Sequence, residues 1–362
     1  MPSSKSVPPN GPENKPVPLE IPIIDLTGLR AGDPGDRQQV ARQIRAACTD
    51  TGFFTIIGHG VPADLLARTR QAAEGFFAAS DDRKRAVLRP PEKISRGWNP
   101  PADRTLANTL GADTPPDLQE AWAMGPPEGG PATRNGAYFT EGAGARFFAP
   151  NKWPELTGFQ DTLTEYYRAM TTLSDQMMRG FALALDLDED YFSNKSNRPC
   201  SIVRLVNYPA QRETPRPGQL RAGAHSDYGS FTFVRGDNVP GGLQVSDGNG
   251  GWQDIEAPED GFVCNIGDTM QRWTGGRFRS TLHRVINPPL GAESRDRISL
   301  VYFHLPNHDA VLGGIDAQQA ETPDDAAPTF AEHYFGKMVR AAKTEGGGST
   351  VSAVDLVAGE TV

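Results

Sequence analysis

The sequence predicts an α+β protein, mainly β, in which helices come first and an antiparallel β barrel or sandwich follows. Two observations favour this fold class. Residues 154–185 form one long amphipathic segment with aromatic and methionine side chains at every third or fourth position. Beyond residue 200, short apolar segments alternate with turns rich in Gly, Pro, Asn and Asp, which is typical of antiparallel strands.

The first part of the chain, residues 19–190, is expected to be mostly helical. Apolar, β-branched runs at 21–26 and 52–57 predict two strands. Helical spacing over 38–50 and 63–78 predicts two helices, the second following a turn that contains Gly and Pro. The expected elements of this part therefore mix two strands with helices.

Residues 82–150 interrupt this pattern with many Pro and Gly residues and scattered aromatics, among them Trp98 and Trp122. A loop region of this length in a compact domain is usually functional, so we expect ordered loops near a site. The two tryptophans could cover a substrate, and the equal alternative is that they anchor packing. The segment 154–185 should pack against a sheet, because its apolar side chains form one continuous face.

The predicted β core occupies residues 200–310. Its expected strands are 202–208, 231–234, 242–245, 252–255, 261–266, 280–286 and 297–304. Residues 1–18 are expected to be a disordered leader, since they are rich in Pro and Ser and have no apolar core. The Gly-Ser-containing stretch 346–362 is expected to be a flexible tail. A single domain would then span residues 19–345.

The composition favours a small-molecule substrate. The 362 residues carry a formal net charge of −9, which argues against a broad nucleic-acid or anionic-membrane surface. The three cysteines, Cys48, Cys200 and Cys264, are widely separated and form no Cys-x-x-Cys pair. This pattern favours a reducing, cytoplasmic environment over a disulfide scaffold.

The most informative motif is His225-Ser226-Asp227, which is followed later by His283. On an extended backbone, residues two apart point to the same face, so His225 and Asp227 can reach one metal. Two neutral imidazoles and one carboxylate form the triad that holds non-haem Fe(II) and leaves open positions for other ligands. The alternative is a surface turn, because a His-x-Asp pair also arises by chance.

Strand alternation supplies a second set of candidates. It places Arg297, Ser299 and Phe303 on one face of the last strand, and Arg204 and Tyr208 on one face of an earlier strand. A buried arginine needs an anionic partner, and its planar guanidinium fits a carboxylate. Beside an open Fe(II) site this favours 2-oxoglutarate, with its keto acid on the metal and its distal carboxylate on Arg297, Ser299 and Tyr208. Arg204 and Phe303 are the candidate substrate contacts, and a structural ion pair is the alternative for Arg204.

With these residues, the chain resembles the 2-oxoglutarate/Fe(II)-dependent dioxygenases related to isopenicillin N synthase. The matching segments are 21–26, 52–54, 59–62, 224–232, 241–245, 265–268, 280–285 and 297–299. The resemblance implies a double-stranded β-helix, or jelly roll, flanked by helices that include one long helix. It also implies iron on His225, Asp227 and His283, with 2-oxoglutarate on Arg297 and Ser299 and in contact with Tyr208.

One position departs from the family pattern. Plant members often carry Asn two residues before the tyrosine, where this chain has Val206, and Asn207 lies on the opposite strand face. Asn207 is therefore not assigned to the site. Arg204, Pro288-Pro289 and the segment 303–308 look most like the bacterial and fungal branch that includes thymine 7-hydroxylase.

The resemblance implies an enzyme that uses Fe(II), 2-oxoglutarate and O2 to hydroxylate, desaturate, cyclise or epoxidise a small organic molecule, with release of succinate and CO2. One alternative is an Fe(II) oxidase like isopenicillin N synthase, which uses no 2-oxoglutarate. Another is a non-catalytic metal-binding protein, although a closed zinc site needs a fourth protein ligand and none is evident in the sequence.

The remaining candidates have simpler interpretations. His59 is expected to be a structural histidine at a strand end. His304 and His308 follow the last predicted strand and could reach the cavity mouth, and solvent exposure is the alternative. Cys264 is expected to fill space in the core rather than to act as a nucleophile.

Overall fold

The structure is a computed structural model that describes residues 20–92, 94–103, 105–112, 114–127, 135–289, 291, 295–315, 327–344 and 357. The expected leader, residues 1–18, and the expected tail, apart from residue 357, lie outside the described residues. None of the helices in these ranges is long and apolar enough to cross a membrane.

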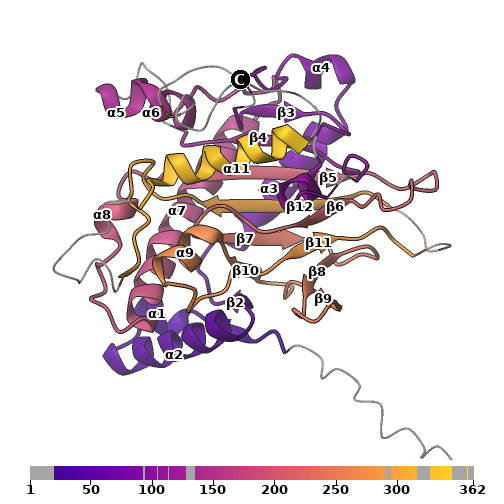
Figure 1. The fold of residues 1–362 in the computed structure, drawn as a ribbon. Coiled ribbons are helices and arrows are strands. Elements are labelled where there is room, and N and C mark those ends of the chain that lie inside the picture. Colours follow the sequence, from indigo (N-terminus) through magenta and orange to yellow (C-terminus); the bar gives the residue numbers. More distant parts are fainter. Residues whose placement is uncertain are drawn as a thin grey trace, which may run out of the picture.

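Two β-sheets form the core of the molecule (Figure 1). The larger sheet has eight strands in the order β1-β2-β10-β7-β12-β5-β4-β3, and the smaller has four in the order β6-β11-β8-β9. All neighbours are antiparallel except β1 and β2. The strands of the larger sheet are β1 (Ile23–Asp25), β2 (Phe53–Ile57), β3 (Gly97–Asn99), β4 (Glu120–Met124), β5 (Ile202–Tyr208), β7 (Phe231–Gly236), β10 (Phe262–Ile266) and β12 (Arg297–His304). Those of the smaller are β6 (Ala222–His225), β8 (Leu243–Ser246), β9 (Trp252–Ile255) and β11 (His283–Val285).

Helices lie outside this pair of sheets. They are α1 (Thr27–Ala31), α2 (Pro34–Asp50), α3 (Ala63–Phe77), α4 (Asp81–Arg85), α5 (Ala137–Thr140), α6 (Gly142–Phe147), α7 (Phe159–Ala184), α8 (Ser193–Ser196), α9 (Asp268–Trp273), α11 (Phe330–Thr344) and the 3-10 helix η1 (Leu106–Leu110). The long helix α7 packs against α2 and α3. It begins after the expected start because Gly158 adopts a left-handed conformation. Sheets flanked by helices, one of them long, confirm the predicted α+β fold class, although these helices contain more residues than the strands.

Alternation along the larger sheet gives it two apolar faces. One face packs against the helices; for example, Leu300 and Tyr302 belong to the same buried cluster as Phe181 of α7. The other face meets the smaller sheet, where Val301 belongs to a second cluster with Val245. Full burial of one such apolar side chain stabilises the folded state by roughly 1.5 to 3 kcal/mol. Both clusters therefore stabilise the fold, and the inner cluster also surrounds the site.

The segment 82–150 contains more regular structure than the expected ordered loops. It contributes β3 and β4, which extend the larger sheet beyond β5. Trp98 and Trp122 are buried in the outer cluster, so they anchor packing and do not cover a substrate. These strands are too short for an apolar period to identify them in sequence, and Pro and Gly surround them.

A buried carboxylate ties this added edge to the rest of the sheet. Glu120 Oε2 accepts hydrogen bonds from Trp98 Nε1 (2.8 Å) and from Lys84 Nζ (3.2 Å). Its Oε1 accepts one from Asn207 Nδ2 (3.1 Å). Asn207, left unassigned from sequence, therefore has a structural role.

We predict that Glu120→Leu lowers the free energy of unfolding by about 3 to 5 kcal/mol, because it leaves the ammonium of Lys84 buried without its main partner. Urea unfolding of the purified protein measures this change. Glu165→Leu is the control, since it removes an exposed ion pair with Arg68 that water screens. Equal destabilisation by the two substitutions would contradict the role assigned to Glu120.

Candidate active site

Two neighbouring strands of the smaller sheet bring the predicted metal ligands together. His225 ends β6 and His283 begins β11, and the two residues lie opposite each other in the strand register. Asp227 follows β6 by two residues. Its Oδ1 lies 3.9 Å from His225 Nε2 and 3.8 Å from His283 Nε2. The three ligand atoms lie within 4.8 Å of one another, so they could hold one metal ion.

Backbone carbonyls orient both imidazoles. Nδ1 of His225 lies 2.8 Å from the carbonyl oxygen of Gly223, and Nδ1 of His283 lies 3.2 Å from that of Thr281. A carbonyl only accepts, so each Nδ1 donates its proton and each Nε2 keeps a lone pair for a metal. Burial, reinforced by the neighbouring His283, lowers the pKa of His225 to about 4. His225 is therefore neutral near pH 7.

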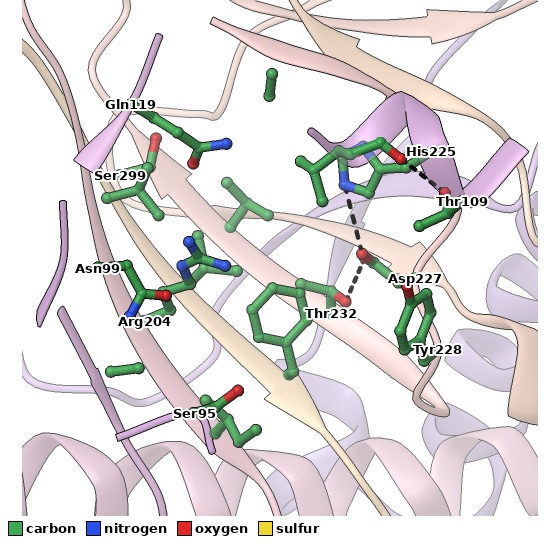
Figure 2. Close-up of a pocket in the computed structure, with 18 of the residues that line it drawn as sticks. Ser95, Asn99, Thr109, Gln119, Arg204, His225, Asp227, Tyr228, Thr232 and Ser299 are labelled. Carbon is green, nitrogen blue, oxygen red and sulfur yellow. Dashed lines mark hydrogen bonds and ion pairs between the residues drawn. The ribbon is translucent and has the colours of Figure 1, made fainter. Parts of the chain in front are cut away.

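Two side chains hold the carboxylate of Asp227. Its Oδ2 accepts hydrogen bonds from Thr232 Oγ1 (2.6 Å) and Asn265 Nδ2 (2.7 Å), while Oδ1 is the oxygen nearer the imidazoles. Figure 2 shows the Asp227 carboxylate between His225 and Thr232. Burial opposes ionisation, but the two histidines and these hydrogen bonds outweigh it and lower the pKa of Asp227. Asn265 was not among the predicted site residues, although alternation from the buried Val263 along β10 places it on the inner face.

A cavity of about 260 Å³ opens beside this triad. All eight residues predicted for the site line it, namely Arg204, Tyr208, His225, Asp227, His283, Arg297, Ser299 and Phe303. Strand alternation in the sequence therefore predicts the correct faces of β5 and β12. The C-terminal helix α11 also lines the cavity, and sequence analysis did not predict this helix.

Arg297 forms a buried cationic end of the cavity. It lies opposite Tyr208 in the β12–β5 register, and its guanidinium carbon is 5.3 Å from the centroid of the tyrosine ring. Nη1 donates to Ser299 Oγ (2.7 Å), and Nε donates to the carbonyl oxygen of Asp237 (3.2 Å). Burial lowers the pKa of Arg297, which nevertheless stays charged. Within the described residues it has no carboxylate ion pair, so this end of the cavity suits a ligand carboxylate.

Asp237, in the loop that follows β7, helps to position Arg297. The Asp237 carboxylate accepts two hydrogen bonds from Arg70 of α3, at 3.0 and 2.9 Å, and one from the backbone N–H of Ile298 (2.9 Å). The preceding Gly236 leaves the space that the arginine needs, because a Cβ there would lie 2.5 Å from Arg297 Nη2. Sequence spacing could not identify these partners, which come from distant segments.

The far wall of the cavity is polar. Figure 2 shows Arg204, Asn99 and Gln119 across the cavity from His225 and Asp227. Asn99 and Gln119 come from β3 and the residue before β4, and both are buried. Asp117 supports this wall. Its carboxylate accepts hydrogen bonds from Leu106 N, Gly223 N and Gln119 Nε2, and burial raises its pKa to about 6.

His59 and His304 serve the fold. His59 accepts from the N–H of Val61 (3.0 Å) through Nδ1 and bonds the carbonyl oxygen of Asp260 (2.9 Å), which confirms its structural role. His304 is buried against Phe231, and burial lowers its pKa to about 3. It is therefore neither exposed nor part of the cavity wall.

Two further predictions concern His308 and Cys264. His308 is half-buried and stacks on Tyr138, with ring centroids 4.0 Å apart, so it does not line the cavity. The expectation that it reaches the cavity mouth was therefore wrong, and the alternative of solvent exposure holds only in part, because the side chain is half-buried. Cys264 is completely buried, which confirms its role as core filler, and burial raises the pKa of its thiol.

Comparison with known proteins identifies the family. Residues 199–306 match the 2OG-Fe(II) oxygenase superfamily, and residues 21–156 match the family described as non-haem dioxygenase in morphine synthesis N-terminal. The chain is 34% identical over 298 residues to validamycin A dioxygenase of Streptomyces hygroscopicus subsp. limoneus, covering 81% of this chain and 78% of the relative. The chain belongs to the 2OG-Fe(II) oxygenase superfamily. This oxygenase is an Fe(II)- and 2-oxoglutarate-dependent dioxygenase by family, as its sequence motifs predicted.

A further relative and a solved structure support the same family assignment. The oxygenase is 31% identical over 301 residues to a 2-oxoglutarate-Fe(II) type oxidoreductase of Emericella nidulans, covering 82% of each chain. Its structure is similar to that of thymine 7-hydroxylase of Neurospora crassa in complex with α-ketoglutarate and thymine, with a TM-score of 0.75 at 27% identity. That match covers 90% of this chain and 97% of the other. The predicted jelly roll and the resemblance to thymine 7-hydroxylase are therefore confirmed.

We predict that Thr232→Val weakens Fe(II) binding by about 10- to 100-fold, because it removes one hydrogen bond that orients Asp227 while keeping the side-chain shape. Anaerobic Fe(II) titration measures the affinity. Thr69→Val is the matched control, since it removes a buried threonine hydrogen bond to the Leu65 carbonyl within α3. An unchanged affinity in Thr232→Val would mean that Asn265 alone is sufficient to orient the carboxylate.

We predict that Gly236→Ala in this oxygenase weakens 2-oxoglutarate binding by about tenfold, or ~1.4 kcal/mol, because the new methyl group displaces the Arg297 guanidinium. The affinity is measured by anaerobic titration of the Fe(II)-loaded protein. Gly75→Ala is the control, since a Cβ there meets no atom within 4 Å. The same affinity in both variants would show that Arg297 tolerates the displacement.

Proposed function

We propose that this oxygenase holds Fe(II) through His225, Asp227 and His283. The observation that supports this most directly is the convergence of the three ligand atoms within 4.8 Å. The hydrogen bonds from both Nδ1 atoms to backbone carbonyls leave both Nε2 atoms available as ligands. Three protein ligands leave coordination positions open for a bidentate co-substrate and O2.

We propose further that Arg297, Ser299 and Tyr208 bind the distal carboxylate of 2-oxoglutarate. The guanidinium is buried, positioned by Asp237 and already aligned with the Ser299 hydroxyl, so little side-chain entropy is lost when a carboxylate binds. The names of the relatives, which specify 2-oxoglutarate, favour this interpretation over an oxidase that does not use it. No observation favours a non-catalytic metal site.

When bound, Fe(II), 2-oxoglutarate and O2 supply the oxidation: one oxygen atom enters succinate as CO2 leaves, and the other oxidises the substrate. The protein's part is to hold the reactants together and to keep bulk water from the site. The apolar cavity residues around Phe303 serve the second task. The position of the substrate relative to the iron decides whether the product is hydroxylated, desaturated, cyclised or epoxidised.

Arg204 and Phe303 are proposed as substrate contacts, and the polar wall defines what they would hold. Arg204, Asn99 and Gln119 are each less than 10% exposed and line the cavity across from the triad. The Asn99 amide nitrogen donates no hydrogen bond to a described residue. This buried Asn99 donor needs an acceptor, so the wall favours a small polar substrate with an acceptor oxygen, positioned against the Phe303 ring.

The metal and co-substrate assignment is tested by anaerobic titration of the Fe(II)-loaded protein with 2-oxoglutarate. Wild type should develop the weak visible charge-transfer band of a keto acid chelated to Fe(II). Arg297→Leu should raise the half-saturating concentration by about 100-fold, since a charged hydrogen bond contributes roughly 1.5 to 3 kcal/mol. Asp227→Ala should give no band because it loses the iron. A normal band in Asp227→Ala would refute the triad.

The substrate wall is tested with a screen of small polar molecules for stimulated succinate release. For any molecule that stimulates wild type, Arg204→Leu should raise its KM at least about tenfold, or ~1.4 kcal/mol. Arg204→Lys should keep part of the effect, because it retains a cation. The 2-oxoglutarate titration should be unchanged in both variants. An unchanged KM in Arg204→Leu would assign Arg204 a structural role instead.

We also propose a cytoplasmic location. All three cysteines are unpaired and buried, which fits a reducing compartment. Fractionation of the source cells with an antibody against the protein tests this location, and recovery outside the cytoplasmic fraction would contradict it.

A further inference from the structure

We propose that Lys337 is a positioning residue that links the closure of the cavity by α11 to the geometry of the metal ligands. The inference rests on the proposed metal site. It concerns a side chain outside the cavity lining, on a helix that sequence analysis did not predict.

The helix α11 forms one wall of the cavity. Tyr334 and Met338, four residues apart, lie on one helix face and line the cavity together with Val339. The helix packs against η1, whose Leu106 and Thr109 line the same cavity. Its start is fixed by reciprocal hydrogen bonds between Thr329 and Glu332, the arrangement of a capping box. The position of α11 therefore helps to set the size of the cavity.

Lys337 points from this helix toward the metal-binding segments. Its ammonium forms an ion pair with Asp268 and donates a hydrogen bond to Ser226 Oγ (3.2 Å). It also lies 4.5 Å from the ring centroid of Tyr228. The Lys337 and Asp268 side chains are only 13% and 15% exposed, so solvent screens this pair much less than a surface pair.

Asp268 joins the two segments that carry the ligands. Its backbone N–H donates to the carbonyl oxygen of Asp227 (2.8 Å), and its Oδ1 accepts from Ser280 Oγ (2.6 Å), three residues before His283. Ser226, the second partner of Lys337, stands between His225 and Asp227. One ammonium thus contacts, directly or through Asp268, both backbone segments that present the triad.

This arrangement makes two events interdependent. A metal that fixes the triad also fixes Ser226 and Asp268, and these hold Lys337 and α11. Thermodynamic linkage then makes the coupling reciprocal. If metal binding raises the equilibrium constant for ordering α11 by some factor, ordering of α11 raises the metal affinity by the same factor. A purely structural ion pair would stabilise the fold without responding to the metal.

The experiment compares amide hydrogen exchange of residues 330–344 in the metal-free protein and in the protein loaded with Fe(II) under anaerobic conditions. Wild type should show exchange of α11 slowed about fivefold or more by the metal, the lower range of typical coupling. Lys337→Met should lose this response, and Lys337→Arg should recover part of it. Lys195→Met, which alters a lysine on α8, is the control and should behave as wild type.

A second readout is Fe(II) affinity, which should fall about fivefold in Lys337→Met, matching the lost exchange response. The proposed coupling is refuted if Fe(II) leaves the exchange rate of α11 unchanged in wild type, or if Fe(II) slows exchange in Lys337→Met as much as in wild type. If Lys337→Met does not fold by circular dichroism, Lys337→Arg carries the test, since a weakened response is still expected there. Equal Fe(II) binding by wild type and Asp227→Ala would instead refute the proposed metal site itself.

Discussion

The antiparallel pairing of β6 with β11 is the interaction on which the site depends. It sets His225 opposite His283, although a long stretch of chain separates them. A shift of one residue in this register would turn one imidazole to the opposite face of the sheet. The hydrogen bonds from both Nδ1 atoms then set the ring orientation, and Thr232 and Asn265 set the carboxylate of Asp227. The strand register therefore positions the two imidazoles independently of any bound ligand.

The partners of a buried charged side chain indicate whether its role is structural or functional. Glu120 accepts hydrogen bonds from three side chains at the sheet edge, and one of them, the Lys84 ammonium, neutralises its charge. Arg297 is equally buried, but its protein partners are a hydroxyl and a carbonyl, which leave its positive charge directed at the cavity. A buried charge is costly without a counter-charge, so this difference in partners indicates that Arg297, and not Glu120, is suited to bind an anionic ligand.

Alternation explains why so much of the site could be predicted from sequence. The strands β5 and β12 run over the expected residues, so a period of two placed Arg204, Tyr208, Arg297 and Phe303 on the correct face. The polar wall on β3 and β4 and the closing helix α11 could not be predicted in the same way. Their strands are three and five residues long, and the contacts of Lys337 join segments far apart in sequence.

Only the inner face of the larger sheet contributes residues to the cavity, although both faces carry buried apolar side chains. Along β5, Val203 and Leu205 belong to the outer cluster, whereas Arg204 and Tyr208 line the cavity. Neighbouring codons therefore encode different properties of the enzyme. During evolution, the inward positions can change to accept a new substrate while the outward positions keep the sheet bound to α7. On β5, a library confined to the inward position Arg204 would therefore vary selectivity while Val203 and Leu205 keep the outer packing intact.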